Sequence, residues 1–178
     1  MKGNLIIELA GNKIIFPCSS GFVFNNQTLR SASIPPEQSI SKVITVENKA
    51  NYESMPYEEG TLIIYSHGYF SPDERAFLIQ LERVLSGIHT SCGTAYLHTG
   101  DLDYGGVKIF QYIKKRIFPK LYPYLMDTQT YDQYMAYGEP IETSKLEKLQ
   151  RTAEPLLQPL IDKICAEKQV IEQESFLF

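Results

Sequence analysis

The chain has 178 residues, of which 43% are hydrophobic and 21% charged, and its formal net charge is −4. This length allows a buried core, and the acidic balance argues against a free-standing basic nucleic-acid binder that relies on phosphate neutralisation alone. The sequence shows neither an apolar run that could span a bilayer nor a signal peptide, so we expect a cytoplasmic protein without membrane contact. The widely spaced Cys18, Cys92 and Cys165 suggest neither a disulfide framework nor a zinc site, and we expect reduced thiols.

Residues 1–40 are predicted to be a small β-rich lead-in, the end of an upstream region. Apolar residues between positions 4 and 16 surround Gly11 and Asn12, a pattern typical of a hairpin. Residues 21–24 are predicted to add a third short strand. The polar stretch at 31–41, which contains Pro35 and Pro36, is the best candidate boundary.

Residues 41–178 are predicted to form an α/β domain with C-terminal helices. Short runs rich in apolar residues at 43–46, 62–65, 94–97 and 121–124 are typical of buried strands. Between them, Ser71, Pro72 and Glu74 have the spacing of a helix N-terminus with a capping box, and Gly87 marks the end of that helix. A second helix is expected over 107–118. Strands alternating with helices predict a mostly parallel sheet with helices on both faces.

The chain from residue 128 onward reads as helical. An apolar stripe runs from Leu146 to Ile164 and is interrupted by Pro155 and Pro159, which predicts two helices or one kinked helix. Such a stripe more often docks on its own domain than on a partner.

Three carboxylates follow predicted strands. Asp101 and Asp103 come after the third strand, and Glu47 comes directly after the first. If those strands are neighbours in a parallel sheet, the three side chains meet at one edge, where oxygen ligands favour Mg²⁺ or Mn²⁺. A D-x-D pair by itself is a weak signal, because a solvated turn or a helix cap explains it equally simply.

A glutamate after one strand and D-x-D after a later strand resembles the Toprim domain of topoisomerases, primases and nucleases. The sequence motifs are also similar to those of the C-terminal domain of the JetD family, the nuclease subunits of Wadjet plasmid-defence systems. The segments that carry this resemblance are V-E-N-K at 46–49, Y-S-H-G-Y-F-S at 65–71, H-T-G-D-L-D-Y-G-G-V-K-I at 98–109, Y-P-Y-L-M-D at 122–127 and the closing I-E-Q-E at 171–174.

The resemblance implies a Toprim-type parallel sheet and Mg²⁺- or Mn²⁺-dependent cleavage of double-stranded DNA, with a relationship to the A subunit of topoisomerase VI. Carried over by position, it makes Glu47 the general acid/base or first metal ligand and makes Asp101 and Asp103 metal ligands. It also implies SMC-like partner subunits. Cutting both strands of a duplex favours two active sites, and hence a homodimer in the intact protein. Thr99 departs from the aromatic residue that the family more often has there, and no winged-helix region precedes the domain, so we expect a fragment or isolated domain.

Four side chains flank the acidic residues and could contact DNA or phosphate: Lys49, His67, His98 and Lys108. Ordinary exposed lysines and satisfied histidines are the alternative interpretation. The run Lys114, Lys115 and Arg116 falls late in a helix, where positive charge complements the helix dipole.

None of the twelve tyrosines stands in a context that marks a nucleophile, which favours hydrolysis by water. Two other functions stay open: a non-catalytic Toprim-like module for assembly or DNA positioning, and a strand-cleaving subunit of the topoisomerase VI A type.

Overall fold

The computed structural model describes residues 1–16, 21–87 and 93–176. Its centre is a sheet of four parallel strands in the order β4-β3-β5-β6, so β3 and β5 are neighbours. The strands are β3 (Lys42–Val46), β4 (Thr61–Tyr65), β5 (Ala95–Thr99) and β6 (Leu121–Pro123). Val46 at the end of β3 lies opposite Tyr65 of β4 and Thr99 of β5, so these three strands end together at one edge. The predicted α/β class with a parallel sheet is confirmed.

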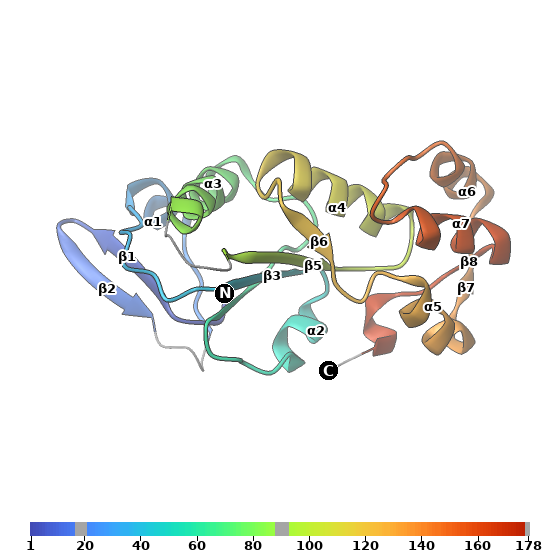
Figure 1. The fold of residues 1–178 in the computed structure, drawn as a ribbon, viewed down its shortest axis with the longest axis horizontal. Helices are drawn as coiled ribbons and strands as arrows, with labels where there is room; N and C mark the ends of the chain where they lie inside the picture. The colour runs from blue at the N-terminus through green and yellow to red at the C-terminus, as the bar shows by residue number, and fades with distance from the viewer. Residues whose placement is uncertain (17–20, 88–92, 177–178) are drawn as a thin grey trace.

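Helices cover the two faces of the sheet unequally (Figure 1). Alternate strand residues such as Val43, Leu62 and Tyr96 join one large core beneath α3 (Pro72–Gly87) and α4 (Tyr104–Arg116). Their neighbours on the other face, Ile44 and Ile63 among them, form a smaller cluster with α2 (Lys49–Ser54). The period-two alternation of strand side chains is what divides these residues between the faces.

The start of α3 confirms the predicted capping box. The Ser71 backbone N–H donates to Glu74 Oε2 at 2.8 Å, and the Glu74 N–H donates to Ser71 Oγ at 3.3 Å. The helix ends at Gly87, as predicted. This reciprocal pair satisfies two backbone donors that the first helical turn leaves unpaired.

The N-terminal segment contains the predicted hairpin, formed by β1 (Leu5–Leu9) and β2 (Asn12–Phe16). The predicted third strand at 21–24 is wrong: these residues pair with no strand, and α1 (Asn26–Ser31) follows them. The side chain of Asn25 caps α1 by accepting from the Thr28 backbone N–H. Leu5 and Ile7 of the hairpin belong to the same apolar core as α3 and α4.

The C-terminal region packs beyond β6 as several short elements at the end of the molecule opposite the hairpin (Figure 1). They are α5 (Thr128–Tyr134), η1 (Met135–Tyr137), β7 (Glu139–Pro140), α6 (Thr143–Gln150), α7 (Gln158–Glu167), β8 (Gln169–Val170) and η2 (Gln173–Phe176). The apolar stripe is therefore two helices, with Pro159 in the first turn of α7, and its buried leucines and isoleucines join the main core.

The cysteines and the length of the helices bear on two further expectations from the sequence. Cys165 is a free thiol, whereas Cys18 and Cys92 lie outside the described residues. Within the described ranges, no helix combines the length and apolar character needed to cross a bilayer.

Candidate active site

Glu47 and Asp101 meet at the edge where β3 and β5 end. The Glu47 backbone N–H continues the strand pairing by donating to the Thr99 carbonyl at 3.0 Å. The Asp101 backbone N–H in turn donates to Glu47 Oε2 at 3.3 Å. The parallel arrangement of the two neighbouring strands thus brings together carboxylates 54 positions apart in sequence.

Gly100 makes this close approach possible. A Cβ atom added at Gly100 would overlap the carboxylate of Glu47 and would crowd Nε2 of His98. A residue without a side chain is therefore needed between the strand and Asp101 if Glu47 is to lie against this turn.

Asp103 is the N-cap of α4. Its Oδ1 accepts a hydrogen bond from the Gly106 backbone N–H at 2.8 Å, and its backbone is extended, as an N-cap requires. A Cβ on Gly106 would collide with the carbonyl of Asp101, so this glycine allows the helix to start tightly against the acidic turn. The helix-cap alternative for the D-x-D pair therefore describes one of its two aspartates correctly.

The C-terminal segment brings a fourth carboxylate and a buried amide to the same edge. Leu102 forms a bridge with Ile171, and the Gln173 backbone N–H donates to Asp101 Oδ1 at 2.8 Å. The neighbouring carboxyl of Glu172 shares a hydrogen bond with the carboxyl of Asp101. Glu172 has no role among the residues expected from the sequence, and the acidic closing segment I-E-Q-E is the signal that could identify it.

Gln173 ties this segment to both strand ends. Its fully buried side chain accepts from the Asn48 backbone N–H at 2.9 Å and donates to Thr99 Oγ1 at 3.0 Å. Asn48 also bonds the carboxylate of Glu174 through its side-chain amide at 2.8 Å. The segment from Ile171 to Glu174 therefore forms one side of the acidic site.

Three carboxyl groups of the site, those of Glu47, Asp101 and Glu172, have raised pKa values. Burial raises the pKa of Glu47 to about 8, and the negative charge of Asp101 acts in the same direction. Burial raises the pKa of Asp101 to about 7, with a smaller contribution from the charge of Glu172, although the hydrogen bond from Gln173 opposes the shift. Burial and the charge of Asp103 likewise raise the pKa of Glu172. Burial is the largest cause of all three shifts, and the negative charges of neighbouring carboxyl groups add to it.

The four flanking side chains lie in different surroundings. His98 is inside β5 with no exposed surface, and Thr45 Oγ1 lies 2.8 Å from its Nδ1. Its ring therefore presents no surface to a phosphate in this structure, and its Nε2 lacks a hydrogen-bond partner among the described residues. Burial lowers the pKa of His98 to about 3, so the ring is neutral.

The other three flanking residues are at least partly open to solvent. His67 follows β4 and contacts Glu74 Oε1 at 3.0 Å, while Lys49 pairs with Glu53 on the surface of α2 at 3.6 Å. Lys108 lies on α4 and donates to Gln111 Oε1 at 3.0 Å.

Comparison with known proteins places the chain in a family. Residues 18–178 match the family described as "Wadjet protein JetD, C-terminal". The chain is 34% identical over 182 aligned positions to "Wadjet protein JetD" of Bacillus cereus (strain Q1), an alignment that covers 98% of this chain. The chain belongs to the JetD C-terminal family. It spans 43% of the length of that JetD protein.

The donor set of this JetD-family domain is suited to a hard divalent cation. Carboxylate oxygens, such as those of Glu47, Asp101, Asp103 and Glu172, are the ligands that Mg²⁺ and Mn²⁺ prefer. Among the described residues, however, no three His, Cys, Asp or Glu side chains are grouped closely enough to hold a metal as they stand. The chemistry of the donors fits a hard cation, which one or two carboxylates and water molecules can hold.

Proposed function

We propose that this domain is the Mg²⁺- or Mn²⁺-dependent endonuclease centre of a Wadjet-type plasmid-defence protein and hydrolyses phosphodiester bonds of DNA. The observation that carries the proposal is the convergence of Glu47, Asp101 and Glu172 from three distant parts of the chain on one sheet edge. A parallel sheet binds its ligands at that edge. The strand order and the position of the acids also support the resemblance to a Toprim domain.

The carboxylates have separate roles in this proposal. Asp101 and Glu172 would hold the cation together with the oxygen of Asp103 that does not cap α4. A bound divalent cation supplies charge neutralisation at the phosphate and lowers the pKa of a water molecule. Burial and the charge of Asp101 raise the pKa of Glu47, and a cation bound beside it would lower that pKa again, so that the carboxylate could accept a proton near neutral pH. It is therefore suited to take the proton of the attacking water and return one to the leaving oxygen.

The proposed substrate and partners follow from family membership. The JetD name of the relative connects this domain with a Wadjet system, and we infer double-stranded DNA as substrate and SMC-like subunits as partners. Cutting both strands of a duplex favours two centres, and hence a homodimer of the intact protein.

A second candidate function is a non-catalytic module that positions DNA or assembles the complex. The capping role of Asp103 and the lack of a preassembled ligand group among the described residues favour it. A strand-cleaving subunit of the topoisomerase VI A type would instead leave a covalent tyrosyl–DNA adduct, which denaturing gel electrophoresis of the reaction detects.

Calorimetric titration with MgCl₂ and MnCl₂ separates the catalytic candidate from the non-catalytic one. Asp101→Asn keeps an oxygen that accepts from Gln173 but removes the charge, so it should abolish cation binding and cleavage while the domain stays folded. The matched control is Asp162→Asn, at an exposed aspartate of α7, which should behave as the wild type. Equal cation binding by the wild type and Asp101→Asn would remove this edge from the mechanism.

A further inference from the structure

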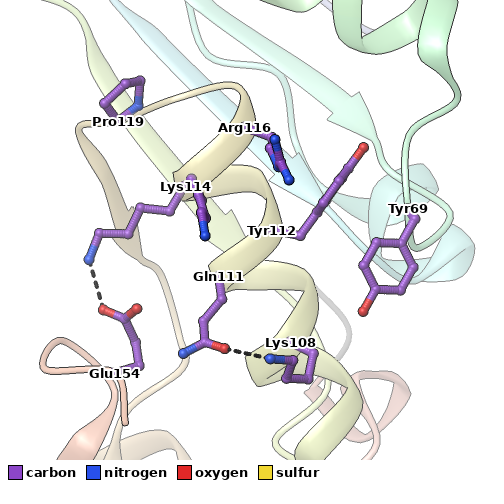
Figure 2. Close-up of a pocket in the computed structure, with 9 residues that line it drawn as sticks. Tyr69, Lys108, Gln111, Tyr112, Lys114, Arg116, Pro119 and Glu154 are labelled. Carbon is purple, nitrogen blue, oxygen red and sulfur yellow. Dashed lines mark hydrogen bonds and ion pairs between the residues drawn. The ribbon is translucent and has the colours of Figure 1, made fainter. Parts of the chain in front are cut away.

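A groove of about 670 Å³ runs along the solvent-facing side of α4. Figure 2 shows Lys108, Tyr112 and Arg116 along the helix, with Tyr69 on one side and Glu154 on the other. The groove is lined by Tyr69, Lys108, Gln111, Tyr112, Lys114, Lys115, Arg116, Pro119 and Glu154. It combines four cationic side chains with two tyrosines, which is a concentration of positive charge in a chain of net charge −4.

Most of this positive charge is uncompensated. Lys114 pairs with Glu154 at 2.7 Å, whereas Lys108, Lys115 and Arg116 form no ion pair with any carboxylate in the described part of the chain. Lys115 and Arg116 are exposed. Single exposed lysines are common, but three unpaired cations on one side of a short helix leave a positive potential that attracts an anion.

The neighbouring helix α3 does not cancel this potential. Its N-terminal carboxylates are engaged elsewhere, because Asp73 pairs with Arg30 at 2.9 Å and Glu74 contacts His67 at 3.0 Å. Arg75 adds another cation beside the groove, with Nη1 donating to the Tyr112 hydroxyl at 3.5 Å.

The groove begins next to the acidic edge. Lys108 is five residues after Asp103 on α4, which corresponds to about 7.5 Å along the helix axis. From Lys108 to Arg116 the helix advances about 12 Å. Tyr69 belongs to the loop after β4, at the same edge as Glu47, and its ring packs edge-on against Tyr112 with centroids 5.0 Å apart.

We propose that this groove binds the sugar–phosphate backbone of duplex DNA and leads the strand to the carboxylates at the N-terminus of α4. The inference rests on the proposed function and adds the surface that holds the substrate. Each strand of B-DNA carries a phosphate about every 3.4 Å along the axis, so the cationic span faces roughly three or four phosphates. Complementing the helix dipole explains the run Lys114, Lys115 and Arg116, but it leaves Lys108 and the two tyrosines of the groove unexplained.

The test is equilibrium binding of a fluorescent blunt duplex to the 178-residue chain in EDTA, followed by anisotropy over a range of salt concentrations. The variant Lys115→Gln/Arg116→Gln keeps the length of both side chains and leaves the acidic site untouched. Affinity should fall roughly tenfold or more, and the slope of log K against log salt should become shallower by about 2. Circular dichroism and thermal melting of each variant confirm that it is folded.

The matched control is Arg83→Gln/Lys145→Gln, which also removes one arginine and one lysine. Both are exposed and have no carboxylate partner in the described part of the chain, and neither lines the groove. The proposal is overturned if the groove variant binds duplex as tightly as this control, or if the wild type binds none. A groove that serves an acidic protein partner would give that second outcome.

Failure of the proposed function gives a different pattern. If the groove binds DNA but the edge has no metal chemistry, the groove variant still loses DNA affinity, while the wild type and Asp101→Asn show the same calorimetric response to MnCl₂. If only the groove assignment is wrong, Asp101→Asn loses cation binding and the groove variant retains full DNA affinity.

Discussion

The environment of Glu47 favours the neutral form of its carboxyl group. Ionisation of this group at high pH therefore lowers the free energy of unfolding. The carboxyl lies against the Gly100 turn, partly shielded from water and next to Asp101. A folded-state pKa above the unfolded value means that folding is most favourable when the group is protonated. Functional sites often contain groups whose pKa values are shifted by burial and by neighbouring charges.

The pH dependence of stability should reveal this effect of Glu47. The pKa of Glu47 is raised from 4.5 to about 8, so the stability that its protonated form contributes is present below pH 4.5 and is lost as the pH rises through about 8. Without metal, urea denaturation should show wild-type stability falling between pH 5 and pH 8.5. Glu47→Gln should reduce that fall by about 1–2 kcal/mol, after allowance for partial solvent screening.

The exposed Glu8→Gln is the control for that measurement and should leave the pH profile unchanged. Parallel profiles for the wild type and Glu47→Gln would show that Glu47 ionises normally. Adding MnCl₂ at pH 8.5 should stabilise the wild type more than Glu47→Gln, because a cation removes the repulsion among the carboxylates.

At the residue level, the sequence predicts the acidic residues that follow directly on strands. It does not predict the acidic residue that tertiary packing brings to the site. Glu47 and Asp101 could be placed together because parallel strands end at a common edge. Glu172 reaches the site through an isolated bridge between Leu102 and Ile171, which has no local sequence pattern. His98 was expected at the edge, but β5 continues through Thr99 and buries it.

Among the elements, α4 joins the site to the rest of the fold, because Asp103 is at once its N-cap and a candidate metal ligand. Substitution can separate these roles. Asp103→Asn keeps the hydrogen bond to the Gly106 N–H and should leave the free energy of unfolding within about 0.5 kcal/mol of the wild type. Asp103→Ala removes the cap and should cost about 1 kcal/mol.

Cation affinity of the same two variants tests the second role of Asp103. If the charge of Asp103 serves a metal, calorimetry should show weaker Mn²⁺ binding for both variants, regardless of their different stabilities. Wild-type affinity in Asp103→Asn would leave the residue only its capping role.

The helices that are easiest to predict from the sequence have capping or terminating residues close to their ends. The capping box at Ser71 and Glu74 and the terminal Gly87 define α3, and the prolines separate α6 from α7. The short helix α1 is not evident from the sequence because residues 21–24 resemble a strand in composition, although none of the strands in the described part of the chain pairs with them. Pairing with a distant segment, and not local propensity, decides whether such residues form a strand.

At the scale of the whole molecule, the site depends on a contact between the last described residues and the centre of the sheet. Asn48 and Gln173 are 125 positions apart, yet the Gln173 side chain satisfies the Asn48 backbone N–H. The C-terminal helices therefore have a second effect besides covering the core, because they return the chain to the acidic edge with Glu172 in place.

Gln173→Ala tests this long-range dependence. The change leaves the part-buried Asn48 N–H and the buried Thr99 hydroxyl without their partner and opens a small cavity, so it should lower the free energy of unfolding by about 2–4 kcal/mol. The exposed Gln150→Ala is the control and should change it by less than about 0.5 kcal/mol. Because the same segment holds Asp101 and Glu172, Mn²⁺ affinity should fall with stability in Gln173→Ala. If Gln173→Ala loses stability but keeps the cation affinity of the wild type, the site forms without the contacts of this C-terminal segment.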